Sequence, residues 1–139
     1  MSGFVEYSEA AAWLTATLTG ISGMTGGVQE HPAAELSTYP LVTFSEQAWT
    51  DVSVINGHRV WSELLFLVTA ISKGESTLAL KAIATEIDNR LHRASGTTTD
   101  GQIIESIRQG GFQTSEVDNG VSYRRLGGFY QLIVQPTNP

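Results

Sequence analysis

The pattern of hydrophobic and polar positions is clearest over residues 56–93. Asn56-Gly57 predicts a two-residue hairpin turn, because both residues accept positive φ angles. The run that follows, residues 59–71, alternates at first and is apolar on both faces from residue 64 to residue 68. A strand with this pattern is expected to run from the rim of a sheet into its middle. We therefore expect residues 59–71 to form the central strand of the fold.

A helix is predicted directly after this strand. Ser72 and Glu75 have the spacing of a capping box, in which each side chain satisfies a free backbone N–H of the other residue. Positive charge in the last turn and Gly96 predict where the helix ends, with a polar turn over residues 95–101. The apolar positions repeat at the spacing of one helix face, and they are Leu80, Ile83, Ala84, Ile87 and Leu91.

The N-terminal half predicts one more helix and a meander. Residues 8–18 carry an apolar stripe behind Ser8, which is placed as the N-cap of a helix. Residues 28–31 predict a short edge strand. Residues 41–47 and 49–55 predict two further strands, and the second of these pairs with the central strand to complete a three-strand meander.

The C-terminal third predicts a long hairpin. Residues 102–117 form its first strand, interrupted by Gly110-Gly111, which indicates a bulge or a bend. After a turn at residues 118–120, residues 121–135 return as a strand that contains Gly127-Gly128, and the two glycine pairs are expected to face each other. The fold class predicted is α+β: a mostly antiparallel sheet of four to five strands, made of the meander and the hairpin, with two helices packed on one face.

Length and composition limit the classes of protein. The 139 residues favour one domain, residues 1–139, with residues 136–139 as an exposed tail. No cysteine is present, which excludes disulfides, thiolate metal sites and a cysteine nucleophile. The longest apolar run, residues 64–68, is far shorter than the roughly 20 residues of a membrane helix. Without the features of a signal peptide at its start, the chain is expected in the cytosol.

Charge and polar motifs give no sign of catalysis. Eight Lys and Arg against fourteen Asp and Glu give a formal charge of −6, which argues against a module that binds nucleic acid by neutralising phosphates. His31, His58 and His92 share no local spacing that would suit a metal. The glycines of residues 20–27 match no phosphate-binding motif and indicate a connector. We predict no enzyme, no cofactor and no metal site.

Aromatic residues on the predicted strands are more informative. If the helices cover one side of the sheet, some of these rings lie on the other side, where contact with another subunit would bury them. The alternative is ordinary core packing or pairing between strands, and for the basic doublet a solvated edge or an ion pair. The candidate interface residues are Trp49, Trp61, Tyr123, Arg124, Arg125, Phe129 and Tyr130.

The order of helix, meander, helix and hairpin resembles the tail terminator (tail-completion) proteins of long-tailed bacteriophages and related phage-like particles. Four segments carry the resemblance. They are a proline ahead of a short strand (residues 40–44), the central strand (62–71), the helix after it (78–91), and a closing hairpin with an acidic turn and a basic pair (116–134).

The resemblance implies a structural virion assembly protein. Such proteins form a ring, commonly a hexamer, that caps the tail tube, ends its polymerisation and joins the tail to the head or neck. The implied partners are other copies of the chain, the tail tube protein and the head or neck connector, with DNA only passing through the lumen and no membrane. The implied location is the host bacterial cytoplasm during assembly and then the head-proximal end of the virion tail. Two alternatives stay open: a head-completion or neck (connector) protein of the same particle, and a small cytosolic α+β ligand-binding module or enzyme.

Overall fold

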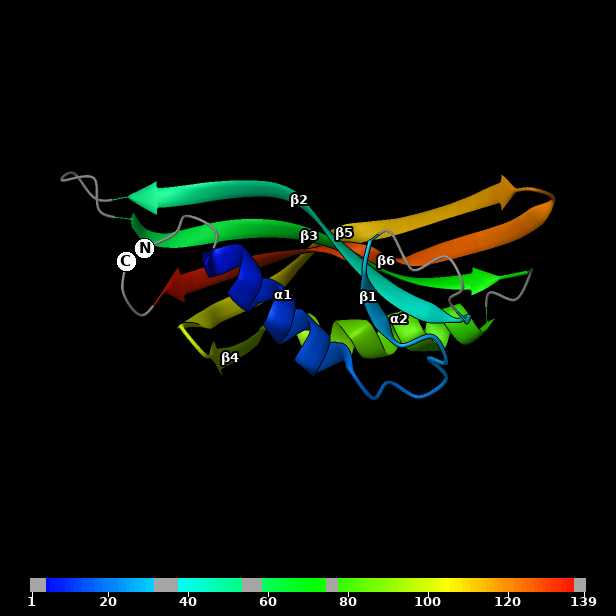
Figure 1. Cartoon of the computed structure of the whole chain (residues 1–139), viewed down its shortest axis with the longest axis horizontal. Coiled ribbons are helices and arrows are strands. Elements are labelled where there is room, and N and C mark those ends of the chain that lie inside the picture. Colours follow the sequence, from blue (N-terminus) through cyan, green and yellow to red (C-terminus); the bar gives the residue numbers. More distant parts are fainter. Residues whose placement is uncertain (1–4, 32–37, 54–58, 75–77, 137–139) are drawn as a thin grey trace.

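The computed structural model describes residues 5–31, 38–53, 59–74 and 78–136. Two helices and one sheet make up this part of the chain (Figure 1). The elements in chain order are α1 (Val5–Leu18), β1 (Val28–Glu30), β2 (Leu41–Ser53), β3 (Arg59–Lys73), α2 (Leu78–Leu91), β4 (Ala94–Thr98), β5 (Gly101–Asp118) and β6 (Val121–Pro136).

The sheet has the strand order β1-β2-β3-β6-β5-β4. Every neighbouring pair is antiparallel except β1 and β2, which run parallel. Figure 1 shows a curled sheet with α1 and α2 lying below the same face. The predicted fold class, α+β with a mostly antiparallel sheet and two helices on one face, is confirmed, although the described chain has six strands where four to five were expected.

The strand count is higher because β1 and β4 join the sheet at its two edges, although two of the predicted strands merge into one. Residues 41–47 and 49–55 were predicted as separate strands, but β2 runs unbroken from Leu41 to Ser53. A register shift between Glu46 and Ala48 absorbs Gln47 as an extra residue, which is how a bulge keeps a strand paired. The predicted turn at Asn56-Gly57 lies outside the described residues. The polar turn expected over residues 95–101 is largely β4, which pairs with the start of β5.

The core lies between the helices and the central strands. β3 is flanked by β2 and β6, as its apolar character on both faces predicted. Its side chains at alternate positions face the helices and are fully buried; they are Leu64, Phe66, Val68 and Ala70. On the opposite face of β3, Leu67 and Ile71 are also buried. Both faces of this strand therefore contribute apolar burial, at roughly 1.5 to 3 kcal/mol for each large side chain before entropy is subtracted.

Helix α2 buries the predicted stripe, although both of its predicted ends are wrong. Leu80, Ile83, Ile87 and Leu91 are buried, and Ala84 is half-buried. Ser72 cannot cap the helix because it belongs to β3 and pairs with Arg124, while Glu75 lies outside the described residues. Gly96 does not end the helix either. Arg93 takes a left-handed φ of 62° after the last turn, and β4 begins one residue later.

Helix α1 begins earlier than predicted. The described helix starts at Val5, so Ser8 is an exposed residue inside it and not its N-cap. The predicted stripe packs into the core, with Ala10, Trp13, Leu14 and Leu18 buried and Ile21 buried just beyond the helix. Gly96 of β4 leaves room for Trp13, because a Cβ there would lie 2.6 Å from the indole Nε1. Gly96 therefore allows α1 to pack against β4, and it does not end α2.

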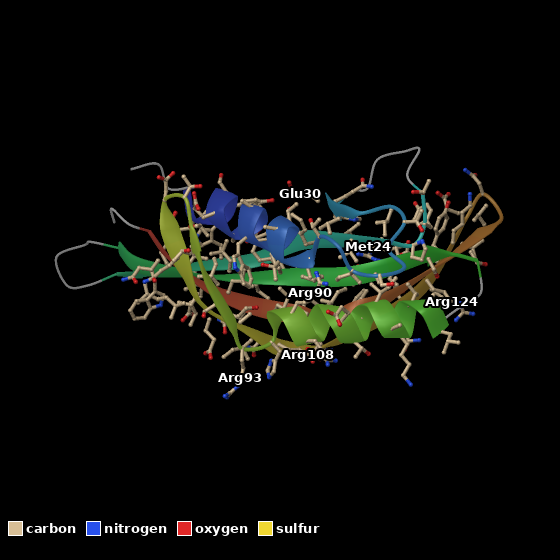
Figure 2. All side chains as sticks on the ribbon, turned by 90° about the horizontal axis from the view of Figure 1, so that it is seen from below. Met24, Glu30, Arg90, Arg93, Arg108 and Arg124 are labelled. Carbon is tan, nitrogen blue, oxygen red and sulfur yellow. The ribbon has the colours of Figure 1, made fainter. Side chains whose placement is uncertain are left out.

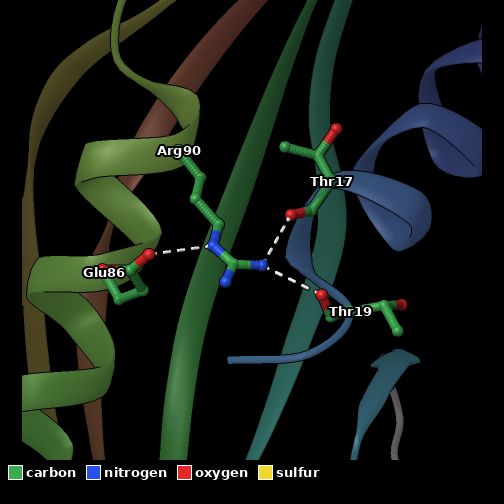
Figure 3. A network of polar contacts seen from close by, with 4 residues as sticks. All are labelled: Thr17, Thr19, Glu86 and Arg90. Atoms are coloured by element: carbon green, nitrogen blue, oxygen red, sulfur yellow. Dashed lines mark hydrogen bonds and ion pairs between the residues drawn. The ribbon is translucent and has the colours of Figure 1, made fainter. Parts of the chain in front are cut away.

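Arg90 joins the two helices (Figures 2 and 3). Its Nη1 donates to the backbone carbonyls of Thr17, at 3.1 Å, and Thr19, at 2.9 Å, at the C-terminal end of α1. Its Nε donates to Glu86 Oε1 at 3.0 Å. The guanidinium lowers the pKa of Glu86, chiefly through this hydrogen bond. Positive charge at the carbonyl end of a helix is favourable. Arg90 therefore satisfies free backbone carbonyls at the end of α1 and, with the same side chain, orients α2.

The glycine pairs of the hairpin face each other as predicted. Gly111 lies opposite Gly128, and a register shift between Arg108 and Gly110 marks the expected bulge. Gly127 pairs with Thr69 of β3, and a Cβ on Gly127 would collide with the backbone carbonyl oxygen of Val68. Gly127 is therefore required for β6 to approach β3 at the centre of the sheet. The predicted turn is also confirmed, with positive φ angles at Asn119 and Gly120.

Gly127→Ala is expected to lower the free energy of unfolding by about 1 to 3 kcal/mol, because the new methyl group pushes β6 away from the β3 backbone. Gly110→Ala is the matched control. A Cβ at Gly110 meets no atom within 4 Å, so its effect should stay below about 1 kcal/mol. Urea denaturation followed by circular dichroism measures both. Equal effects of the two substitutions would contradict the close-approach explanation.

Arg90→Ala is expected to lower the free energy of unfolding by about 1 to 3 kcal/mol, because the backbone carbonyls of Thr17 and Thr19 lose a charged donor. Lys81→Ala, an exposed cation on the same helix, should change stability by less than about 0.5 kcal/mol. Chemical denaturation of both variants tests this. If Arg90→Ala were as neutral as Lys81→Ala, the link between the helices would carry no stability.

Candidate subunit-contact surface

The two faces of the sheet differ in what covers them. Both helices pack on one face, and no described helix or strand packs over the other, which we call the open face. Strand register decides which side chains point to it. Leu67 and Phe129 are opposite each other there, as are Ile71 and Arg125. Residues that are two positions apart along β3 or β6 therefore share the open face.

The seven predicted interface residues divide between the two faces. Register places four of them on the open face, and these are Trp61, Tyr123, Arg125 and Phe129, all only partly exposed. The other three point to the helix side of the sheet, and these are Trp49, Arg124 and Tyr130. Of the seven predicted residues, three aromatic side chains and one cation therefore share the open face, and the structure does not bring all seven together on one surface.

Arg125 is the centre of a polar and aromatic cluster on the open face. Its side chain is only 15% exposed. The guanidinium lies 5.6 Å from the ring centroid of Phe112, and its Nη2 donates to Thr69 Oγ1 at 3.2 Å. Glu116 lies 4.0 Å from its Nη1. A partly desolvated guanidinium above an aromatic face is favourable, so Arg125 rigidifies this part of the hairpin.

Sequence reasoning missed three of the residues that hold Arg125, namely Thr69, Phe112 and Glu116. Phe112 also meets Phe129 edge to face, with ring centroids 5.9 Å apart. A signal for Phe112 exists in the sequence. Once the two glycine pairs face each other, Phe112 falls beside Gly127, whose missing side chain leaves space for a ring. Thr69 lies inside an apolar run and gives no comparable signal.

Trp49 and Tyr130 contribute to the packing of the chain itself, as the alternative interpretation held. Trp49 stacks on Tyr7 of α1, with centroids 6.4 Å apart, and its Nε1 donates to Asp51 at 2.9 Å. Tyr130 is 2% exposed, and its hydroxyl donates to Asp88 of α2 at 2.9 Å. Burial raises the pKa of Tyr130 above its ordinary value, and the hydrogen bond to Asp88 raises it further.

In the described part of the chain, no group of three or more His, Asp or Glu residues could hold a metal ion. His92 Nδ1 accepts a hydrogen bond from the backbone N–H of Arg108, His31 is exposed after β1, and His58 lies outside the described residues. A shallow depression between α2 and β6 contains Asp88 and Arg108, and Arg108 Nη1 lies 3.8 Å from Asp88 Oδ1. Neither described helix is long and apolar enough to cross a membrane.

The architecture defines a class of protein: a two-layer α+β fold with one helix-covered face and one open aromatic face. The fold is shared with a solved structure described as "Virion of native gene transfer agent (GTA) particle". The two chains are 15% identical and superpose with a TM-score of 0.57, over 92% of this chain and 90% of the other. No family model and no curated protein matches the chain. The similarity therefore establishes the fold.

Tyr130→Phe is expected to lower the free energy of unfolding by about 0.5 to 1.5 kcal/mol, because Asp88 loses its hydroxyl donor. A raised folded-state pKa also means that the phenol ionises first in the unfolded chain. Its contribution to stability is thus complete below about pH 10 and is lost as the pH rises through the folded-state pKa. In a phenolate absorbance titration, Tyr130→Phe should remove the last component to appear, whereas Tyr123→Phe should retain it. Loss of that component in Tyr123→Phe instead would contradict the assignment.

Proposed function

We propose that this chain is a structural component of a phage-like virion. The single observation that carries the proposal is the shared fold, which extends over nearly the full length of both chains and has a virion protein as its counterpart. Within the described residues, no cluster of His, Asp and Glu could hold a metal ion. The alternative of a small ligand-binding module or enzyme has no comparable observation in its favour.

Within such a particle, we propose that the chain is a tail terminator that forms a ring, most simply a hexamer. The open face supports this role, because partly exposed aromatic side chains gain most when a neighbouring subunit covers them. Trp61, Phe129 and Phe112 would supply apolar area on that face, while Arg125 is already ordered by its contacts within the chain. A rigid aromatic and arginine surface loses little entropy on association, which suits a contact between subunits.

The acidic balance also suits a ring through which DNA passes. A formal charge of −6 per chain gives a ring of six copies a strongly negative field, which repels phosphates and lets DNA slide. The tail tube protein and the head or neck connector would then be the partners at the two ends of the ring. The chain would act in the host bacterial cytoplasm during assembly and remain in the virion tail. A channel lined with lysine and arginine would contradict this part of the proposal.

Trp61→Glu is expected to weaken self-association at least about tenfold, because a charge replaces an aromatic ring on the open face. Ala82→Glu, at an exposed position on α2, is the matched control and should associate like the unchanged protein. Sedimentation velocity over a range of concentrations measures association, and circular dichroism checks that both variants fold.

Two results would count against this function. If Trp61→Glu does not fold, Trp61 is a core residue of the chain and not an interface residue. A strict monomer at every concentration, also in the presence of tail tubes, would favour the small ligand-binding module. Gold labelling of the chain in assembled particles distinguishes the remaining alternative, since a head-completion or neck protein would be found at the head vertex and not at the tube end.

A further inference from the structure

Charge is distributed unevenly along the chain. Residues 1–58 contain six Asp and Glu and not one Lys or Arg, whereas residues 59–139 contain eight residues of each sign. The formal charge of −6 therefore belongs entirely to the first 58 residues, and the remainder of the chain is neutral. This distribution affects association only if the fold keeps the two parts on different sides of the molecule.

The fold does keep the two parts on different sides. The first 58 residues supply α1, β1 and β2, and β1 and β2 form one edge of the sheet. Figure 2 shows α1 and Glu30 toward one long side of the molecule, and α2 with Arg93 and Arg108 toward the opposite long side. The layer that contains the helices is therefore anionic along one side and carries its cations along the other.

Two carboxylates define what we call the acidic side, and they are Glu30 at the end of β1 and Glu46 on β2. Glu30 lies opposite Phe44, which is buried under the helices, so both point to the helix-covered face. Glu46 lies opposite the buried Phe66 and points to the same face. The Tyr7 hydroxyl of α1 donates to Glu30 and orders its carboxylate. Neither Glu30 nor Glu46 takes part in an ion pair within the described residues.

Three exposed cations define the basic side, and they are Lys81 on α2, Arg93 just after it and Arg108 on β5. Arg108 lies opposite Tyr130 and so is also on the helix-covered face. Together with Lys81 it lines the shallow depression between α2 and β6. Among the ion pairs of the described chain, Arg108 has Asp88 as its partner, whereas Lys81 and Arg93 belong to none. The basic side therefore keeps positive charge that the chain itself does not neutralise.

The carboxylates near the basic side do not cancel this charge. On α2, Glu86 is paired with Arg90 and Asp88 is paired with Arg108. The carboxylates of β5 point to the open face, away from α2, and these are Glu105, Glu116 and Asp118. Positive charge thus dominates around α2 on the helix-covered face, although the half of the chain that contains α2 is neutral as a whole.

Unlike charge on opposite sides favours one way of bringing two copies together. Two acidic sides or two basic sides would oppose like charges, whereas an acidic side and a basic side attract each other. Such a contact joins different surfaces of the two copies, so it can repeat from copy to copy and closes into a ring when the rotation divides a full turn. Each chain carries both members of the contact, so a second copy is a sufficient partner.

We infer that copies of this chain meet side to side, with the acidic side of one copy against the basic side of the next. The inference rests on the proposed ring and specifies which surfaces meet in it. Attraction between the unlike sides sets the orientation of the subunits and speeds their encounter. The partly exposed rings of the open face add apolar area to the assembly.

Reversing the charge of the acidic side tests this contact. Glu46→Lys is expected to weaken self-association about threefold to tenfold, because it places a cation against the basic side. The substitution also changes the formal charge from −6 to −4, so a general decrease in repulsion would strengthen association instead. Asp100→Lys makes the same change in charge in the exposed turn between β4 and β5, and this matched control should not weaken association.

Reversing the basic side completes the test. Lys81→Glu combined with Arg93→Glu should also weaken self-association, and Lys81→Glu alone serves if the end of α2 is disturbed. An equal mixture of the combined variant with Glu46→Lys should associate more strongly than either protein alone, because the reversed sides attract each other. Raising NaCl from about 0.05 M to about 0.5 M should weaken association of the unchanged protein. Sedimentation velocity measures association, and circular dichroism checks folding.

Each other outcome contradicts the contact between the two sides. If the protein forms oligomers that none of the reversals weakens, the subunits meet elsewhere, while the proposed ring still stands. If only one side responds, or if the mixture restores nothing, the two sides do not face each other. If reversal of the basic side abolishes binding of duplex DNA and leaves self-association unchanged, the cations serve nucleic acid. If the unchanged protein is a monomer under all conditions, the side contact and the proposed function both fail.

Discussion

The fold depends on the contact between β3 and β6. These two strands join a half made of β1, β2 and β3 to a half made of β6, β5 and β4, and their pairing runs without a shift from Ser62 to Lys73. The approach is possible because Gly127 places no side chain against the backbone of Val68. Once the halves are joined, they present one continuous apolar face, and both amphipathic helices bury their stripes against it. Arg90 then orients one helix against the other.

The same arrangement determines where the molecule can contact others. Two short helices cover one face of a six-stranded sheet, and the other face keeps its rings only partly buried. Partly exposed rings on an open face are the kind of surface that contact with another chain would bury.

Much of this fold could be predicted from the sequence, because the signals are local. Alternation and a double-sided apolar run identified β3, the spacing of Leu80 and Ile87 identified α2, and the two glycine pairs set the hairpin. What could not be predicted depends on contacts between distant residues. The bulge at Gln47 joins two predicted strands into β2 and reverses which residues face the helices, so that Trp49 points inward. The left-handed conformation of Arg93 and the hydrogen bond from Arg90 to the end of α1 likewise depend on how distant elements pack.

The candidate interface was harder to predict than the fold for the same reason. Tyr130 looks like a surface residue in an alternating strand, but α2 supplies Asp88 to its hydroxyl and buries it. Arg125 looks like half of a solvated doublet, but Phe112 and Thr69 order it on the open face. Residues on one strand can be assigned to faces from sequence, whereas the elements that cover each face must be known before an interface can be proposed.

The central claim is that this chain is a subunit of a ring. Electron microscopy of the purified protein at high concentration, with particle averages classified by symmetry, tests it most directly. The account predicts closed rings with an open lumen, six-fold in the simplest case. Particles that are only monomers or two-fold dimers, with no ring also when tail tubes are added, would contradict it.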